Sequence, residues 1–463
     1  MAVPLQAGDL VRIVLQHRDP FAAAAVYNVA TAGQRQALEE VIVGERRNAL
    51  MFARWEHTPG GVLQAMAGIG DQAVKMRLDK NPGTPGQALS HLYSGEKQAA
   101  LIGLIAQHTH TPANVLEAIA AFESDLNILK AVSSNSAASV RAIRLLVTRM
   151  PGQFDSAVAT NPATPADVLE QIYARGNAFI RAAIVAHASC PLPVLDRACG
   201  EHEINVLRPV ARDQRVNPEV LVRLAGHADA AIRRGVAANP ATPDALIDML
   251  AKDDAVSVRR TLATRKFLTP ATVMCLSQDA DHWVRQWLGR YPLLPKIMLQ
   301  QLAQDSEMIV RRAVARNPAS PAQLLKKLAG DSEAWVRAAV AYQVNATPSL
   351  LRWLAEDTEV DVLSGVAAHP RTPQHILQRL AQSPDADVRR GVILNRSAKR
   401  RVLWPLLQDP YYLHRMLLIG NPVLSEKDRW GLRDDPDKAV RFAVFKWFSD
   451  RFAQGEKSIK AMQ

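Results

Sequence analysis

The stretch that decides the fold is Asp305–Leu328, which reads DSEMIVRRAVARNPASPAQLLKKL. Its second half predicts a short helix, because Leu324, Leu325 and Leu328 share one face at helical spacing. Pro321 suits the first helical turn, and Ser320 before it is a favoured N-cap residue. Each such unit therefore predicts two short helices, each with one apolar face that only a neighbouring unit can cover.

The unit repeats with a constant period of 26 residues from about residue 161 onwards. The leucine-type position of the first helix recurs at Leu169, Leu195, Leu221, Ile247, Val273, Leu299, Leu325, Leu351, Leu377 and Leu403. The position that opens the second helix recurs at Ile180, Val206, Ile232, Val258, Val284, Val310, Val336, Val362 and Val388. This pattern predicts an all-α fold, an α-solenoid of about 15 two-helix repeats.

The flanking segments depart from the repeat pattern. Residues 1–54 are helical in character but off the consensus, which predicts an N-terminal helical cap over the first open face. Recognisable repeats cover residues 55–445, and the polar residues 446–463 are expected to form a C-terminal cap or frayed tail. No composition break marks a further domain.

Composition limits the class of protein. The formal net charge is +11 and the three cysteines contain no Cys-x-x-Cys pair, which argues against a disulfide framework and favours a reduced, cytoplasmic setting. No run of about 18 apolar residues predicts a membrane span. The basic charge permits a nucleic-acid partner without requiring one.

Three stretches carry a family resemblance: NPATPADVLEQI from Asn161, NPATPDALIDMLAKDDAVSVRRTLA from Asn239 and NPASPAQLLKKLAGDSEAWVRAAVA from Asn317. They resemble the leucine-rich repeat variant family, and the Asp-x-x-x-x-Val-Arg run is also similar to HEAT repeats. The resemblance implies a right-handed superhelix of alternating α and 3₁₀-type helices. Some members carry an N-terminal iron–sulfur cluster, but no cysteine precedes Cys190 here, so no cofactor or metal is expected.

Two charged columns follow the repeat. The acidic column and the basic column six residues later predict a structural ladder, in which each Asp caps a helix and accepts from an Arg of its own or the next unit. Its central members are Asp253, Arg259, Asp279, Arg285, Asp305, Arg311, Asp331 and Arg337.

A further basic column directly follows the ladder position, at Arg208, Arg234, Arg260, Arg312 and Arg390. On the concave surface, this column would form a basic stripe for a phosphate backbone or an acidic protein surface. The competing interpretation is a solvated face. Trp283, Trp287, Trp335 and Trp353 lie near these arginines in sequence, as partner-binding candidates or as packing residues.

No catalytic motif was found, and no catalytic residue is expected. The sequence predicts a non-enzymatic interaction scaffold that binds a protein partner on its curved face. The alternative is a nucleic-acid-binding solenoid that uses the arginine columns, including a HEAT-like DNA glycosylase with Asp279, Asp281 and His282 as its acid/base cluster.

Overall fold

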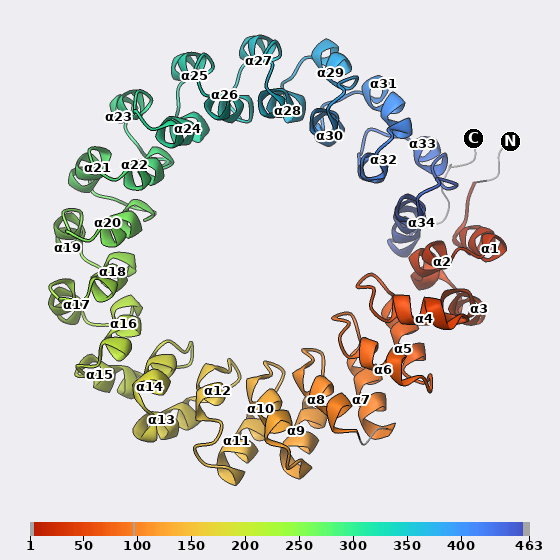
Figure 1. Cartoon of the computed structure of the whole chain (residues 1–463), viewed down its shortest axis with the longest axis horizontal. Coiled ribbons are helices and arrows are strands. Elements are labelled where there is room, and N and C mark those ends of the chain that lie inside the picture. Colours follow the sequence, from red (N-terminus) through yellow and green to blue (C-terminus); the bar gives the residue numbers. More distant parts are fainter. Residues whose placement is uncertain (1–3, 96–97, 457–463) are drawn as a thin grey trace. The chain divides into compact units, whose positions relative to one another are not determined.

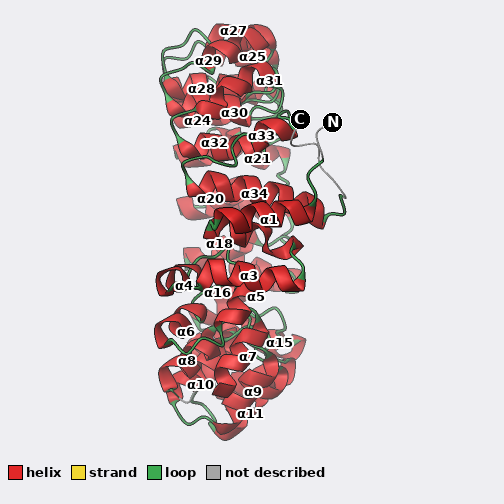
Figure 2. Cartoon of the chain, turned by 90° about the vertical axis from the view of Figure 1, so that its right-hand side faces the viewer, coloured by secondary structure: helices red, strands yellow, loops and turns green. Residues whose placement is uncertain are grey.

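The computed structural model describes residues 4–95 and 98–456. These residues form 34 α-helices and two 3₁₀ helices, with no β-strand among them. Figure 2 shows only helices and loops in this part of the chain. The all-α solenoid predicted from the 26-residue period is confirmed.

The helices fall into two compact units, one containing Gln6–Val220 and the other containing Leu221–Phe448. The helices of the 6–220 unit are α1 (Ala7–His17), α2 (Pro20–Val26), η1 (Tyr27–Val29), α3 (Ala32–Val43), α4 (Arg46–Phe52), α5 (Gly60–Met66), α6 (Gln72–Leu78), α7 (Gly86–Gly95), α8 (Ala99–Gln107), α9 (Ala113–Phe122), α10 (Leu126–Ser134), α11 (Val140–Arg149), α12 (Asp155–Thr160), α13 (Ala166–Arg175), α14 (Ala178–Val185), α15 (Leu192–Cys199) and α16 (Ile204–Arg212).

Helix α17 (Pro218–Ala225) begins the steady series of the second unit. The helices that follow are α18 (Ala230–Ala238), α19 (Asp244–Leu250), α20 (Val256–Ala263), α21 (Pro270–Ser277), α22 (His282–Gly289), α23 (Lys296–Leu302), α24 (Met308–Arg316), α25 (Ala322–Leu328), α26 (Ala334–Ala341), α27 (Pro348–Leu354), α28 (Val360–Ala368), α29 (Gln374–Leu380), α30 (Ala386–Leu394), α31 (Arg400–Leu403), η2 (Trp404–Gln408), α32 (Tyr412–Ile419), α33 (Glu426–Trp430) and α34 (Lys438–Ala453).

First and second helices alternate within the 221–448 unit and form two layers. Each second helix packs on the second helix of the next repeat, as α22 does on α24 and α24 on α26. In Figure 1 the second helices of this unit lie on the inner side of its row, and the first helices lie on the outer side. We call these rows the second-helix layer and the first-helix layer.

The core lies between the two layers and uses the columns predicted from the sequence. Val310 and Val314 of α24 are fully buried, as are Leu325 and, within 2%, Leu328 of α25. Burying a leucine or valine side chain contributes about 1.5–3 kcal/mol relative to leaving it exposed. Each repeat supplies such residues to the next, so adjacent repeats hold one another.

Buried amides join several repeats to the preceding one at the turn after the second helix. Asn317 is 1% exposed, and its Nδ2 donates to the backbone carbonyls of Gly289 and Tyr291 in the preceding repeat, at 2.8 and 2.9 Å. Its Oδ1 accepts from the backbone N–H of Ala319 at 2.8 Å. Other asparagines bridge two carbonyls of the preceding repeat in the same way: Asn81, Asn135, Asn161 and Asn395.

Two local predictions were wrong. Ser320 is not an N-cap, because its hydroxyl donates back to the carbonyl of Val314 at 2.6 Å, and Pro321 is the N-cap of α25 instead. The alternation of α and 3₁₀ helices implied by the resemblance is also absent from the described repeats, where both helices are α-helical except for the short η2. Apart from the shorter α31 and α33 and the longer α34, six to ten residues with a buried apolar face form the α-helical turns of these repeats.

The predicted boundaries of the caps stay a prediction. Helix α34 runs continuously from Lys438 to Ala453, across the expected boundary at residue 445. The part of the expected C-terminal tail from residue 457 onwards lies outside the described residues.

Candidate interaction surface

The charged ladder runs between repeats. Arg311 of α24 donates to both carboxylate oxygens of Asp331, which precedes α26 in the next repeat, at 2.7 and 3.0 Å. The two side chains are only 15% and 9% exposed. The same pairing joins Arg233–Asp253, Arg259–Asp279, Arg285–Asp305, Arg337–Asp357, Arg389–Asp409 and Arg415–Asp435.

Each ladder aspartate also shapes the turn before its own second helix. Asp305 accepts from the backbone N–H of Glu307 at 3.0 Å, and Glu307 rather than the aspartate is the N-cap of α24. The expectation that the aspartate caps the helix is therefore wrong by two residues. Arg337 lowers the pKa of Asp357, an effect that burial opposes, so this carboxylate is ionised at neutral pH. The charged groups of these ladder residues are therefore already engaged in ion pairs with the neighbouring repeat.

The acidic residues of the glycosylase alternative, Asp279 and Asp281, are both held by arginine side chains. Asp279 accepts both of its charged hydrogen bonds from Arg259, and its side chain is only 5% exposed. Asp281 likewise accepts from Arg260 at 2.9 and 2.6 Å. Neither carboxylate is available to a substrate in this arrangement.

The further basic column is less uniform than the sequence suggested. Arg260 forms an ion pair with Asp281, so its charge is compensated. Arg208 and Arg390 are exposed, whereas Arg234 and Arg312 are half-buried. In the intervening repeats the same position is Gln286, Ala338 and Ser364. A continuous basic stripe is therefore not formed in the 221–448 unit.

Arginine and tryptophan side chains meet on the second-helix layer. The Arg312 guanidinium of α24 lies 4.8 Å from the ring centroid of Trp335 on α26, and Arg290 lies 5.3 Å from that of Trp287 on α22. Trp335 is 52% exposed and Trp287 is 39% exposed. We call the set Trp287, Arg290, Arg312, Arg316, Trp335 and Tyr342 the Arg–Trp patch.

The side chains next to Tyr342, at one edge of the patch, include negatively charged carboxylates. Burial, and then Asp361, raise the pKa of Tyr342, on which Arg316, Asp387 and Arg390 also act. Asp361 and Asp387 are exposed on α28 and α30. Gly365 of α28 lets Tyr342 pack closely, because a Cβ at this position would lie 3.0 Å from the tyrosine ring. The patch is thus a short basic and aromatic surface that ends against carboxylates.

Sequence reasoning found only part of the patch. It selected Arg312, Trp335 and Trp287 but missed Arg290, Arg316 and Tyr342. The available signal was helical spacing, because residues 335 and 338 of α26 and its C-cap residue 342 share one face, and the equivalent residues of α24 are 309, 312 and 316. Trp283 is 44% exposed and lies beside His282 rather than over Arg260.

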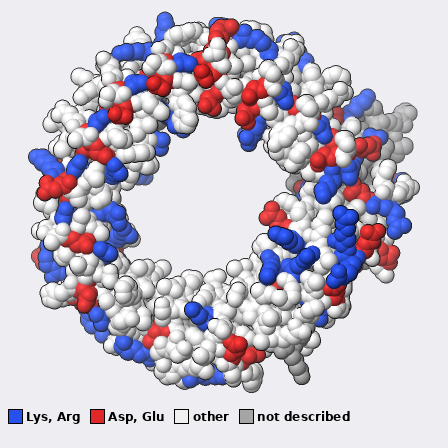
Figure 3. Space-filling model, viewed as in Figure 1, with Lys and Arg blue, Asp and Glu red and all other residues white. Residues whose placement is uncertain are grey.

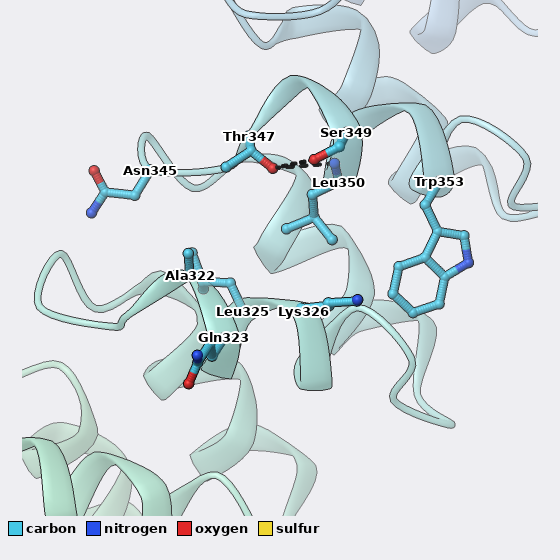
Figure 4. Close-up of a pocket in the computed structure, with 9 residues that line it drawn as sticks. All are labelled: Ala322, Gln323, Leu325, Lys326, Asn345, Thr347, Ser349, Leu350 and Trp353. Carbon is cyan, nitrogen blue, oxygen red and sulfur yellow. Dashed lines mark hydrogen bonds between the residues drawn. The ribbon is translucent and has the colours of Figure 1, made fainter.

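A pocket lies on the first-helix layer. It has a volume of about 440 Å³, opens between α25 and α27 and is lined by Leu325, Lys326, Leu350 and Trp353, together with the turn before α27 (Figure 4). Trp353 therefore lies on the opposite layer from Trp335, not beside the arginine column as the sequence suggested.

Charges of both signs are mixed elsewhere on the surface. On the face that Figure 3 shows, Asp and Glu lie interspersed with Lys and Arg rather than in a single-sign band. Among the described residues, no group of three or more His, Cys, Asp or Glu side chains could hold a metal ion. No helix in the described ranges is long and apolar enough to cross a bilayer.

Comparison with known proteins gives structural neighbours only. The sequence matches no protein-family model and no curated protein. The solved structure of a leucine-rich repeat variant with a novel repetitive motif is 24% identical, covers 54% of this chain and 88% of its own, and has a TM-score of 0.31. The family that the sequence resembles is thus also among its structural neighbours.

Two other neighbours are longer proteins. Kap121p is 13% identical with a TM-score of 0.33, and the match covers 96% of this chain but only 57% of Kap121p. The Pds5–Scc1 complex structure is 12% identical with a TM-score of 0.24, and the match covers 95% of this chain and 77% of the other.

Proposed function

We propose that this chain is an interaction scaffold that binds a protein partner across the second-helix layer of the 221–448 unit. The observation that carries this proposal is the stacking of Arg312 on Trp335, on a surface where the tryptophan is still 52% exposed. Trp, Tyr and Arg are the residues that most often dominate the energy of protein–protein interfaces. Within the patch they occur together on three consecutive second helices.

The surface favours a protein over a nucleic acid. A phosphate backbone needs a sustained basic track, but the arginine column is interrupted by Gln286, Ala338 and Ser364, and Arg260 is already paired. The faces of Trp287 and Trp335 carry guanidinium groups, so bases would have to displace them to stack. Since Asp279 is held in the ladder, we propose no catalytic step.

Two tryptophan variants test the proposal. Nuclease-treated lysate is passed over immobilised wild type, W335A and the control W353A, and the retained proteins are quantified by mass spectrometry. Trp353 is 49% exposed but lies on the other layer, so it is a matched control. We expect partners that wild type and W353A retain and that W335A loses by roughly tenfold or more, as for an interface hot spot.

Two outcomes contradict the proposal. Equal retention by all three proteins would show that this layer does not select partners. Loss on nuclease treatment alone, together with binding to arbitrary RNA or DNA that weakens steeply with salt, would favour the nucleic-acid alternative.

A further inference from the structure

The Arg–Trp patch contains arginines that form no direct ion pair within the described part of the chain. In the described part of the chain, Arg290, Arg312 and Arg316 neither form an ion pair with a carboxylate nor donate a hydrogen bond to one, in contrast to the ladder arginines. Burial, and then the positive charges of Arg316 and Arg290, lower the pKa of Arg312, while the negative charge of Asp361 acts in the opposite direction. A guanidinium stays charged nevertheless, so the repulsion remains.

Two of the three side chains are already held in place. Arg290 lies over Trp287 and Arg312 lies over Trp335, which restricts their rotamers while leaving their edges free to donate. Ordering a long side chain costs about 0.5–1.5 kcal/mol on binding, so a ligand that meets these guanidinium groups avoids part of that cost. Carboxylates match the guanidinium edge with two parallel hydrogen bonds.

The spacing of the patch fits an extended chain. Arg290, Arg316 and Tyr342 occupy one repeat position at the C-terminal ends of the consecutive second helices α22, α24 and α26. Packed helices lie about 8–10 Å apart, and one three-residue turn of a polyproline II helix spans about 9 Å and returns the side chain to the same face. A peptide that crosses the layer in this extended conformation would therefore present one side chain to each helix at every third residue.

We infer that the Arg–Trp patch binds an acidic peptide segment with carboxylates three residues apart, which meet Arg316 and Arg290, and with an apolar side chain near Tyr342. This inference rests on the proposed function and names its partner class. A long polyanion fits less well, because Asp361 and Asp387 are exposed directly beyond Tyr342. The carboxylates of a short segment end before those side chains, whereas a nucleic-acid strand would continue against them.

A defined peptide library tests the inference on the full chain. A random dodecapeptide phage library is selected on wild type and then sorted on R290Q/R312Q/R316Q and on the control R352Q/R371Q/R396Q. The control removes the same charge from three exposed arginines outside the patch. Circular dichroism checks that both variants keep the wild-type helix content.

We expect clones that wild type and control retain and the patch variant loses, with Asp or Glu enriched at positions three apart. The affinity of the synthesised peptides should fall by roughly tenfold or more in the patch variant, because charged partners would then lose paired hydrogen bonds. Replacing their acidic residues by lysine should restore binding to the charge-reversed variant R290E/R316E.

The failures are distinguishable. Patch-dependent clones with no excess of acidic residues would overturn the acidic class and leave the protein-binding proposal standing. The absence of patch-dependent clones would overturn the inference, and the W335A experiment would decide the proposed function separately. Oligo-uridine binding to wild type and control but not to the patch variant would overturn the peptide in favour of RNA.

Discussion

Arg311 and Asp331 form a bidentate ion pair between consecutive repeats, and the same guanidinium also donates to the backbone carbonyl of Asp305 at 2.9 Å in its own repeat. One side chain therefore ties the turn of one repeat to the turn of the next. Since the pair is largely shielded from water, its geometry contributes more than that of a surface pair.

Replacing Arg311 by alanine should lower the free energy of unfolding by about 2–3 kcal/mol, because it leaves the Asp331 carboxylate shielded and unpaired. Urea denaturation followed by circular dichroism measures the change. Replacing Arg144 by alanine is the control, since Arg144 and Asp167 are 53% and 59% exposed and should contribute only about 0–1 kcal/mol. An equal decrease in the free energy of unfolding in the two variants would contradict the conclusion that the ladder pair contributes more to stability than an exposed pair.

The buried amide of Asn317 gives a second prediction. Asn317→Ala removes donors to two buried carbonyls and should destabilise the chain by about 2–4 kcal/mol. Asn317→His should cost less, because His108, His187 and His369 occupy the same repeat position and each places Nε2 at 2.8–3.0 Å from a carbonyl of the preceding repeat. Thermal melting of the two variants compares them, and a histidine variant as unstable as the alanine variant would argue against this role.

Asp79 predicts a dependence on pH near neutrality. It is 4% exposed, and within the described ranges neither of its carboxylate oxygens has a hydrogen-bond partner. Burial raises its pKa to about 7. A raised folded-state pKa contributes stability below the unfolded value near 4, and this contribution is lost as the pH rises to about 7.

Wild type should therefore melt at a lower temperature at pH 8 than at pH 5, and Asp79→Ala should reduce this difference. Linkage allows an effect of up to about 4 kcal/mol for a shift of this size. Alanine fits the site, because the equivalent position is Ala106, Ala159 or Ala237 in other repeats. An unchanged pH dependence in the variant would show that Asp79 is not its source.

Asp428 predicts the opposite dependence in acid. Arg400 donates to both of its oxygens at 2.7 and 2.6 Å and lowers its pKa to about 2, while burial opposes the shift and Ser425 adds to it. Because the folded-state pKa is depressed, the stabilisation is present above about pH 4 and is lost as the pH falls towards 2. Melting curves should show wild type about 2 kcal/mol more stable than Asp428→Asn at pH 7, with the two converging by pH 2.

The period of the sequence predicted the helices and their core because apolar burial is set by spacing. Val310 and Leu325 need only their positions in the repeat to be assigned to the interior. The direction of the ladder could also have been predicted. Where Leu363 replaces the ladder arginine, the residue 20 positions later is Ser383 rather than aspartate, and Leu207 and His227 are replaced together in the same way. Because the arginine and the aspartate 20 residues later are lost together, the two residues that pair belong to consecutive repeats.

Other features could not be predicted from spacing alone. Arg260 and Arg312 occupy the same repeat position, yet one pairs with Asp281 and the other lies over Trp335. The difference depends on which side chain of the next repeat lies within reach of the arginine: Asp281, the N-cap of α22, for Arg260, and Trp335, near the start of α26, for Arg312. The spacing of the sequence does not determine which of these contacts forms. Ser320 was misassigned for a similar reason, since its hydroxyl has both a following helix and a preceding carbonyl within reach.

The Arg–Asp pairs of the 221–448 unit each join one repeat to its immediate neighbour. A mechanical force should therefore break these ion pairs one after another, instead of crossing one cooperative barrier to unfolding. Stretched in an optical trap, this unit should lengthen in small steps of about one repeat, and the step that includes Leu363 and Ser383, where the ion pair is missing, should occur at lower force.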